Sequence, residues 1–296
     1  MPELPEVETI RAGLQQKVVG LKITDVEVLF GKSFPYPGED IDKYVIGAKI
    51  ESLERRAKVL IINLSSDHSL LFHLKMTGQI VWAPKSGPRF AGGHPSESMA
   101  RELPDNSTRA VFSLSDGSRI FFNDQRKFGW VKLVETQDVI RDSLIARLGP
   151  EPLTEAFELK PFAAILKRRG GSPIKAVILD QSTVSGVGNI YADESLHLAK
   201  IHPARLAGSL KPAEVKSLYE AIKTIIALGV EHGGTSFTHY VNALGGKGDY
   251  LRSARVFRRQ GLTCPVCGTV IIKTRVAGRG THLCPKCQKA PQAGVK

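Results

Sequence analysis

The sequence predicts an α+β multidomain fold: an N-terminal β-sandwich with flanking helices over residues 1–135, a helical domain over 150–235 and a small hairpin domain over 251–290. Three observations support it. The chain of 296 residues is longer than one average domain. Its first half carries short apolar runs and its second half helical periodicity. All four cysteines lie near the C-terminal end.

Strands are expected in the first half, where short runs rich in Ile, Val and Leu partly alternate with polar residues. These runs cover residues 22–30, 48–53, 58–64, 69–75, 108–114 and 119–123. Asp116 and Gly117 form a strong hairpin signal between the last two. Short strands at this spacing indicate a sandwich or a barrel. Residues 83–107 contain four prolines and three glycines without a clear period, so we expect a long surface loop there.

Helices are expected at the start of the chain and through its second half. Residues 5–19 fit a helix with Pro5 at its first position. Glu6 and Glu8 then lie near the positive end of the helix dipole, and we assign both a structural role. Further helices are predicted by apolar spacing and by stop signals over residues 137–148, 161–169, 174–180, 189–200 and 212–232.

The cysteines form two CxxC pairs separated by sixteen residues, which is typical of a zinc site. The predicted ligands are Cys264, Cys267, Cys284 and Cys287. Disulfides are the alternative, but they are disfavoured in a chain without a secretory signal. Four thiolates leave no open position on the metal, so the one zinc ion should be structural. It should hold a β-hairpin made of residues 269–274 and 280–283, with Arg279 near the tip.

The charge distribution predicts a polyanionic partner. The net charge is +12, and residues 251–296 contain ten Lys and Arg but no Asp or Glu. This exceeds what is needed to offset a tetrathiolate zinc site. We therefore expect nucleic acid as the partner, ahead of an anionic membrane surface. No apolar run approaches the roughly 18 residues of a membrane span, so we expect a soluble, cytoplasmic protein.

The first residues combine a nucleophile with an acid. If Met1 is removed, Pro2 has a free secondary amine, and an α-amino group has a lower pKa than a lysine side chain. Such an amine condenses with an aldehyde carbon to a cationic iminium, which suits elimination chemistry. Glu3 is placed to transfer the proton that the reaction needs. The alternative is a frayed start without function.

Five stretches together resemble bacterial formamidopyrimidine-DNA glycosylases. They are MPELPEVET at the start, HLKMTGQ at 73–79, NDQRKFGW at 123–130, DQSTVSGVGNIYADE at 180–194 and the four-cysteine finger. The resemblance implies a helix-two-turn-helix domain beside the finger, and a monomer that acts on double-stranded DNA in the bacterial cytoplasm, at the nucleoid. It implies excision of oxidised purines such as 8-oxoguanine and formamidopyrimidines, followed by strand cleavage through β- and δ-elimination.

The resemblance also assigns roles to single residues. Pro2 would attack C1′ of the damaged nucleotide, Glu3 would assist ring opening, and Lys58 would contact a phosphate near the lesion. Other phosphates would be held by His73, Asn189 and Arg279, and the last of these also supports the chemistry beside the lesion. The space left by the everted nucleotide would be filled by Met76, Arg126 and Phe128. A glycine-rich loop over residues 233–250 would close over the base.

Two alternatives remain at this point. Endonuclease VIII shares the proline nucleophile and the finger but prefers oxidised pyrimidines, and Leu4 argues against it because that branch usually has glycine there. A non-catalytic zinc protein that binds DNA or structured RNA would explain the charge and the finger. The terminal amine and Glu3 argue against that second alternative.

Overall fold

The structure is a computed structural model that describes residues 1–94, 96, 99, 101–235 and 249–291. The chain divides into two compact units. Unit 1 comprises Met1–Ala146 with His232–Asp249, and unit 2 comprises Arg147–Glu231 with Tyr250–Lys296. Each unit is described by itself.

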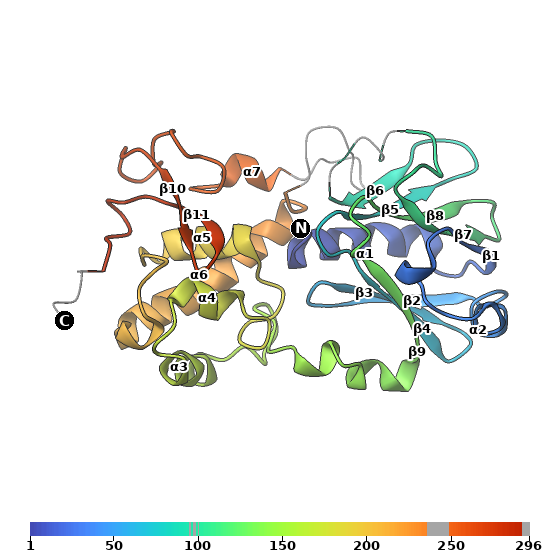
Figure 1. Ribbon diagram of the computed structural model, residues 1–296, viewed down its shortest axis with the longest axis horizontal. Helices are drawn as coiled ribbons and strands as arrows, with labels where there is room; N and C mark the ends of the chain where they lie inside the picture. The colour runs from blue at the N-terminus through green and yellow to red at the C-terminus, as the bar shows by residue number, and fades with distance from the viewer. Residues whose placement is uncertain (95, 97–98, 100, 236–248, 292–296) are drawn as a thin grey trace. The chain divides into compact units, whose positions relative to one another are not determined.

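Unit 1 is a β-sandwich of two antiparallel sheets, which confirms the sandwich prediction (Figure 1). The five-stranded sheet has the order β1-β7-β8-β5-β6, with strands Ile23–Val28, Thr108–Leu114, Arg119–Asp124, Gly78–Ala83 and Phe90–Gly93. The four-stranded sheet has the order β2-β3-β4-β9, with strands Ile50–Arg56, Val59–Leu64, His68–His73 and Trp130–Glu135. Of these nine strands, β5, β6 and β9 were not expected from the sequence.

Aromatic side chains from both sheets meet in the core of unit 1. Phe72 of β4 contacts Phe112 of β7 and Phe122 of β8 edge-on, with ring centroids 5.7 and 5.9 Å apart. All three rings are buried. Edge-to-face aromatic pairs add to the stabilisation that burial provides. The expected hairpin at Gly117 is confirmed, because β7 and β8 pair around a turn in which Gly117 has φ 83°.

The first helix, α1, spans Leu4–Val18 and packs against β6 of one sheet and β2 and β3 of the other. Its N-cap is Glu3, so Pro5 is the second helical residue rather than the first. A proline is tolerated there, since the first N–H groups of a helix have no intrahelical partner. Gly13 lies on the face toward β6, where a Cβ atom would meet the Phe90 ring.

The predicted loop over residues 83–107 was wrong in part. It contains β6, which pairs with β5, and Phe90 is only 2% exposed. Prolines and glycines hid a short strand whose side chains pack on α1. Leu103, also in this segment, is buried in a small cluster with Val81 and Phe121.

The predicted helix over residues 137–148 was also wrong. The structure has two 3₁₀ turns instead, Thr136–Arg141 and Ile145–Arg147. Asp142 interrupts the segment, because its carboxylate accepts the backbone N–H groups of Leu144 and Ile145. Ile140, assigned to the apolar face of that helix, is 73% exposed. A further helix that was not expected, α2, spans Gly38–Tyr44.

Unit 2 contains the helices predicted between residues 161 and 232, a short helix α7 that was not expected, and the C-terminal hairpin (Figure 1). Its helices are α3 at Leu159–Arg168, α4 at Ile174–Leu179, α5 at Asn189–Leu198, α6 at Pro212–Glu231 and α7 at Tyr250–Ser253. The hairpin strands are β10 at Ile272–Val276 and β11 at Arg279–Leu283. Among the described residues, no helix is both long and apolar enough to cross a membrane.

Two acids of α5 attach the C-terminal segment to the helical part of unit 2. The Glu194 carboxylate accepts the backbone N–H groups of Arg255, Val256 and Phe257 at 2.7–2.9 Å. Asp193 accepts the backbone N–H of His282 in β11 at 2.8 Å. Both carboxylates are fully buried, and buried acids of this kind require such donors. Backbone N–H groups of the C-terminal segment thus donate to two side chains of α5, and these hydrogen bonds fix the finger to that helix.

Candidate functional site

The N-terminal segment is held in place from within unit 1. Pro2 is buried and Glu3 is 2% exposed, whereas Met1 is exposed. The Glu3 backbone N–H donates to Glu6 Oε2 at 2.8 Å. Glu6 Oε1 accepts the backbone N–H and the hydroxyl of Thr235 at 2.7 and 3.0 Å. This start is not frayed, and the structural role expected of Glu6 is confirmed.

Glu8 also has the expected structural role. Its carboxylate forms ion pairs with Arg11 at 2.7 Å and with Arg55 of β2 at 2.9 Å. Burial opposes ionisation, but hydrogen bonds from the two guanidinium groups prevail and lower the pKa of Glu8. Glu8 thereby connects α1 to the four-stranded sheet.

Lys58 and His73 lie close together at the end of the β3–β4 pair. Lys58 is 6% exposed and precedes Val59, which pairs with His73. Burial, together with the charges of Lys75 and Lys58, lowers the pKa of His73 to about 3. The imidazole is therefore neutral at pH 7. Its Nδ1 accepts the backbone N–H of Lys75 at 3.0 Å, which leaves the proton on Nε2 as a neutral donor.

The three side chains expected to fill the DNA stack come from two loops of unit 1. Met76 is 37% and Phe128 is 53% exposed, so both apolar side chains are open to a partner. The guanidinium of Arg126 lies over the Phe128 ring, 4.8 Å from its centroid. The structure thus brings an exposed flat cation and an exposed ring together.

Asp124, at the end of β8, fixes both loops. Its Oδ2 accepts the backbone N–H groups of Phe128 and Gly129 at 2.7 and 2.6 Å, and its Oδ1 accepts that of Arg126 at 3.2 Å. The Thr77 hydroxyl donates to the same Oδ1 and accepts the Arg126 N–H at 3.1 Å. Asp124 is fully buried. One carboxylate therefore sets the backbone on which the exposed side chains stand.

Asn189 and Arg279 lie at the junction of α5 and the hairpin in unit 2. Arg279 is exposed and pairs with Val276 directly beside the turn at Ala277 and Gly278, as expected for the hairpin tip. Asn189 Nδ2 donates to the Gly280 carbonyl at 3.0 Å. A cleft of about 490 Å³ opens here, lined by Asn189, Phe257, Arg258, Gln260, Lys273, Gly280 and His282. Its basic lining suits an anion.

A buried ion pair holds β11 next to this cleft. Lys175 of α4 contacts Asp193 of α5 at 2.6 Å, and both side chains are fully buried. Lys175 Nζ also donates to the Gly280 carbonyl and to the Thr281 hydroxyl at 3.0 and 2.8 Å. These bonds place the backbone of the residue that follows Arg279.

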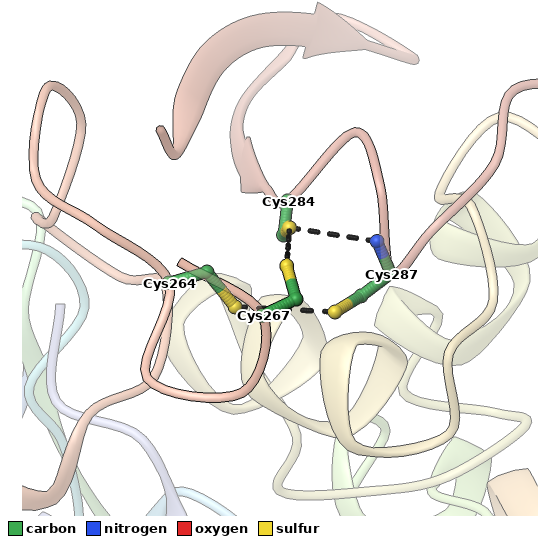
Figure 2. A group of neighbouring side chains, drawn as sticks. All are labelled: Cys264, Cys267, Cys284 and Cys287. Atoms are coloured by element: carbon green, nitrogen blue, oxygen red, sulfur yellow. Dashed lines mark hydrogen bonds between the residues drawn. The ribbon is translucent and has the colours of Figure 1, made fainter. Parts of the chain in front are cut away.

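The four cysteines form the metal centre that the spacing predicted. Their sulfur atoms lie within 4.8 Å of one another and point into a common space (Figure 2). Burial and the neighbouring sulfur atoms raise the pKa of Cys287 to about 12. A dication bound by four cysteines stabilises their deprotonated form and so offsets the raised pKa. Four sulfur ligands suit zinc. The residues present therefore fit one structural zinc ion held by Cys264, Cys267, Cys284 and Cys287.

Sequence reasoning missed Asp124, Thr77, Lys175 and Asp193. Asp124 stands inside the quoted stretch NDQRKFGW, where an acid among basic and aromatic residues could have suggested a loop anchor. Asp193 stands inside the quoted stretch DQSTVSGVGNIYADE, whereas Lys175 lies outside all five stretches. The predicted role of the glycine-rich loop falls mainly on residues 236–248, which lie outside the described part of the chain.

Three family models match successive parts of the chain. The formamidopyrimidine-DNA glycosylase N-terminal domain matches residues 1–131, the H2TH domain of the same family matches residues 148–241, and the zinc finger found in FPG and IleRS matches residues 261–290. Several relatives among curated proteins are named formamidopyrimidine-DNA glycosylase. Those of Pelotomaculum thermopropionicum and Enterococcus faecalis are each 42% identical over 290 residues, which cover 98% of this chain and 99% and 98% of theirs.

Solved structures agree with these matches. A complex between a Lactococcus lactis FPG mutant and DNA containing Fapy-dG has a TM-score of 0.86 and 34% identity, over 98% of this chain and 100% of that one. A complex between the Lactococcus lactis Fpg and DNA with an abasic site has the same TM-score and identity, over 97% and 100%.

Proposed function

The chain belongs to the formamidopyrimidine-DNA glycosylase family, and from this premise we propose that it removes oxidised purines from double-stranded DNA and then cleaves the strand. It is a bifunctional glycosylase and AP lyase of base excision repair. The observation that carries the proposal is the N-terminus. There Pro2 and Glu3 are both buried. The carboxylate of Glu6, in the first turn of α1, accepts the backbone N–H of Glu3 and so fixes this segment to the helix. This is a rigid setting for an amine beside a carboxylic acid.

The proposed reaction begins after Met1 has been removed. The lone pair of the Pro2 nitrogen forms a bond to C1′, and the bond from C1′ to the damaged base breaks, with the electron pair leaving on the base. The N–H proton of the Pro2 nitrogen passes to the departing base. Glu3 then donates a proton to O4′, the bond from C1′ to O4′ breaks, and the nitrogen lone pair forms the double bond of an iminium at C1′. The cationic iminium acidifies the C2′ proton. Loss of that proton expels the 3′ phosphate, and a second elimination expels the 5′ phosphate.

Four residues have proposed roles toward the DNA backbone. We assign Lys58, Asn189, Arg279 and His73 to phosphates. In support, Arg279 is exposed at the hairpin tip and Asn189 lines a basic cleft. His73 supplies a neutral N–H donor rather than a charge. Phosphate contacts of this kind fix the register of a protein on the duplex without reading its sequence.

We assign Met76, Arg126 and Phe128 to the space that the everted nucleotide leaves. Their exposure and the Arg126–Phe128 contact support this role. Inserted apolar wedges offset part of the cost of unstacking. The Arg126 guanidinium can also hydrogen-bond the base opposite the lesion. Residues that fill the stack matter only after the nucleotide has left it.

The proposal extends to organisation and location. We retain three domains, 1–135, 150–235 and 251–290, which are close to the extents of the three matched family models. We propose a monomer in the bacterial cytoplasm, at the nucleoid where its substrate lies. The net charge of +12 supports a polyanionic partner.

Borohydride trapping tests the nucleophile. Added during reaction with a duplex that contains 8-oxoguanine opposite cytosine, borohydride should reduce the iminium and leave DNA attached to the peptide that starts at Pro2. The intact mass of the protein should show that Met1 is absent. Trapping at an internal lysine would overturn the assignment of Pro2.

Glu3→Gln tests the acid. The amide keeps the size of the side chain but cannot donate the proton, so excision should be lost while DNA binding remains. Glu8→Gln is the matched control, since Glu8 lies in α1, the helix that Glu3 caps, and loses ion pairs with Arg11 and Arg55. If Glu3→Gln excised the base as fast as Glu8→Gln does, the proposed role of Glu3 would be contradicted.

A further inference from the structure

A histidine outside the finger reaches one of its cysteines. His197 lies on α5 and is 2% exposed. Its Nε2 atom is 3.4 Å from the sulfur of Cys264, although the two residues are 67 positions apart in sequence. His197 belongs to neither CxxC pair, and both residues lie in unit 2. The contact is a hydrogen bond to a metal ligand from a different structural element.

The chemistry of the ligand sets the direction of this hydrogen bond. A cysteine that binds zinc is a thiolate and has no proton to donate, so Nε2 of His197 must carry the hydrogen. The other ring nitrogen, Nδ1, is buried and has no hydrogen-bond partner among the described residues. Placing the proton on Nε2 therefore satisfies the one N–H of the ring.

We propose that His197 is a positioning residue for the zinc centre: its Nε2–H donates to the Cys264 thiolate, fastens the first CxxC pair to α5 and slows the loss of zinc. A site of four thiolates around one dication carries a net charge of −2 in a partly buried place. Donors to the sulfur atoms offset this charge and orient the ligands. Partners of this kind are typically worth a factor of 10 to 100 in metal affinity.

The second CxxC pair is attached to the same region by a different residue. Gln288, which is fully buried, accepts the backbone N–H of Cys284 at 3.0 Å through Oε1. Its Nε2 donates to the carbonyl of Ile201, just after α5, at 2.9 Å. Each CxxC pair thus has one side-chain link to α5 or the turn that follows it. Zinc retention should then depend on this helix as well as on the four ligands.

The proposal predicts the rate of zinc release. His197→Phe keeps an aromatic ring but removes the donor, whereas His197→Gln keeps an N–H donor at similar reach. With excess EDTA, the Phe variant should lose zinc roughly tenfold faster than the wild type, and the Gln variant should stay within about threefold. The zinc that stays with the protein is measured by a colorimetric chelator after the EDTA has been removed and the protein denatured, independently of DNA and of activity. Equal release from the wild type and the Phe variant would overturn the proposal.

A second readout separates the hydrogen bond from general loosening. In protein reconstituted with Co²⁺, the sulfur-to-cobalt charge-transfer band should move to lower energy in the Phe variant, because a thiolate without its donor is more easily oxidised. The Gln variant should keep the wild-type band. Leu196→Ala is the packing control, since Leu196 is the fully buried neighbour on α5. It should loosen the helix and leave the band in place, and an equal shift there would contradict the proposal.

If the Phe variant does not fold, His197→Asn replaces it in both measurements. The shorter Asn amide cannot reach the sulfur, whereas the Gln amide can. Slow release from Gln with fast release from Asn supports the hydrogen bond. Equal release from the two variants refutes it.

Discussion

The buried carboxylate of Asp124 accepts the backbone N–H of Phe128 at 2.7 Å, and the Phe128 ring itself is 53% exposed. An apolar ring on a surface loop would normally fold back onto the protein. Here a fixed backbone prevents this, because Gly129 and Arg126 donate to the same carboxylate. The backbone of the loop is therefore fixed without DNA, and the insertion that we propose would cost little conformational entropy.

Asp124→Asn should disturb this loop. The amide places an N–H donor where Asp124 Oδ2 now accepts two N–H groups, and unsatisfied buried donors cost about 1–3 kcal/mol each. We expect slower excision and a weaker preference for cytosine over adenine opposite 8-oxoguanine. Single-turnover excision on the two duplexes measures both effects.

Asp116→Asn is the control for this prediction. Asp116 accepts the N–H and hydroxyl of Ser118 in an exposed hairpin turn, so its loss should leave the opposite-base preference unchanged. Arg126→Ala should relax the preference in the same direction as Asp124→Asn. If Asp124→Asn lost only stability and kept its preference, the carboxylate would not position the loop.

The variants Arg279→Ala and His73→Ala should differ in how strongly their DNA binding depends on salt. Arg279→Ala removes a charge. The negative slope of log K against log salt should therefore become shallower by roughly 0.9, the value for one phosphate contact. His73→Ala removes a neutral donor, since the pKa of His73 is held at about 3. Binding should weaken without a change of slope. Fluorescence anisotropy at four or more salt concentrations, on damaged and undamaged duplex, measures both.

The stability of unit 1 should fall in acid because of His73. Its pKa is about 3 in the folded state against 6.5 ordinarily, so the unfolded chain takes up a proton that the folded chain refuses. Stability is therefore fully present above pH 6.5 and lost progressively as pH falls toward 3, by up to about 1.4 kcal/mol per pH unit. Urea unfolding at pH 7 and pH 5 should show a smaller loss for His73→Gln than for the wild type.

Loss of the Lys175 charge alone should lower the stability of the protein more than loss of both charges of the Lys175–Asp193 ion pair. Lys175→Met leaves the Asp193 carboxylate buried without its cation, which typically costs about 3–5 kcal/mol. The double variant Lys175→Met with Asp193→Asn removes both charges and should recover part of that loss. Thermal unfolding of the wild type, of Lys175→Met, of Asp193→Asn and of the double variant measures the coupling. Additive effects would show that the pair does not act as a unit.

Local patterns in the sequence were sufficient to predict many of the structural elements. The cysteine pairs predicted the metal centre because the spacing within each CxxC pair is itself the ligand geometry. Helices α3 to α6 were predicted because their apolar positions repeat within each segment. Sequence failed at β6 and at residues 137–148, where prolines, glycines and Asp142 compete with the periodic signal.

The sequence by itself determined which chemical groups this protein carries: Pro2 beside Glu3, four zinc ligands and a basic C-terminal segment. Only the tertiary structure decided how they are held. The bond from Thr235 to Glu6, like the contact of His197 with Cys264, joins residues far apart in the chain. Such contacts depend on how distant elements pack, and hydrophobic periodicity records only which face of each element is buried, not which polar atom lies opposite it.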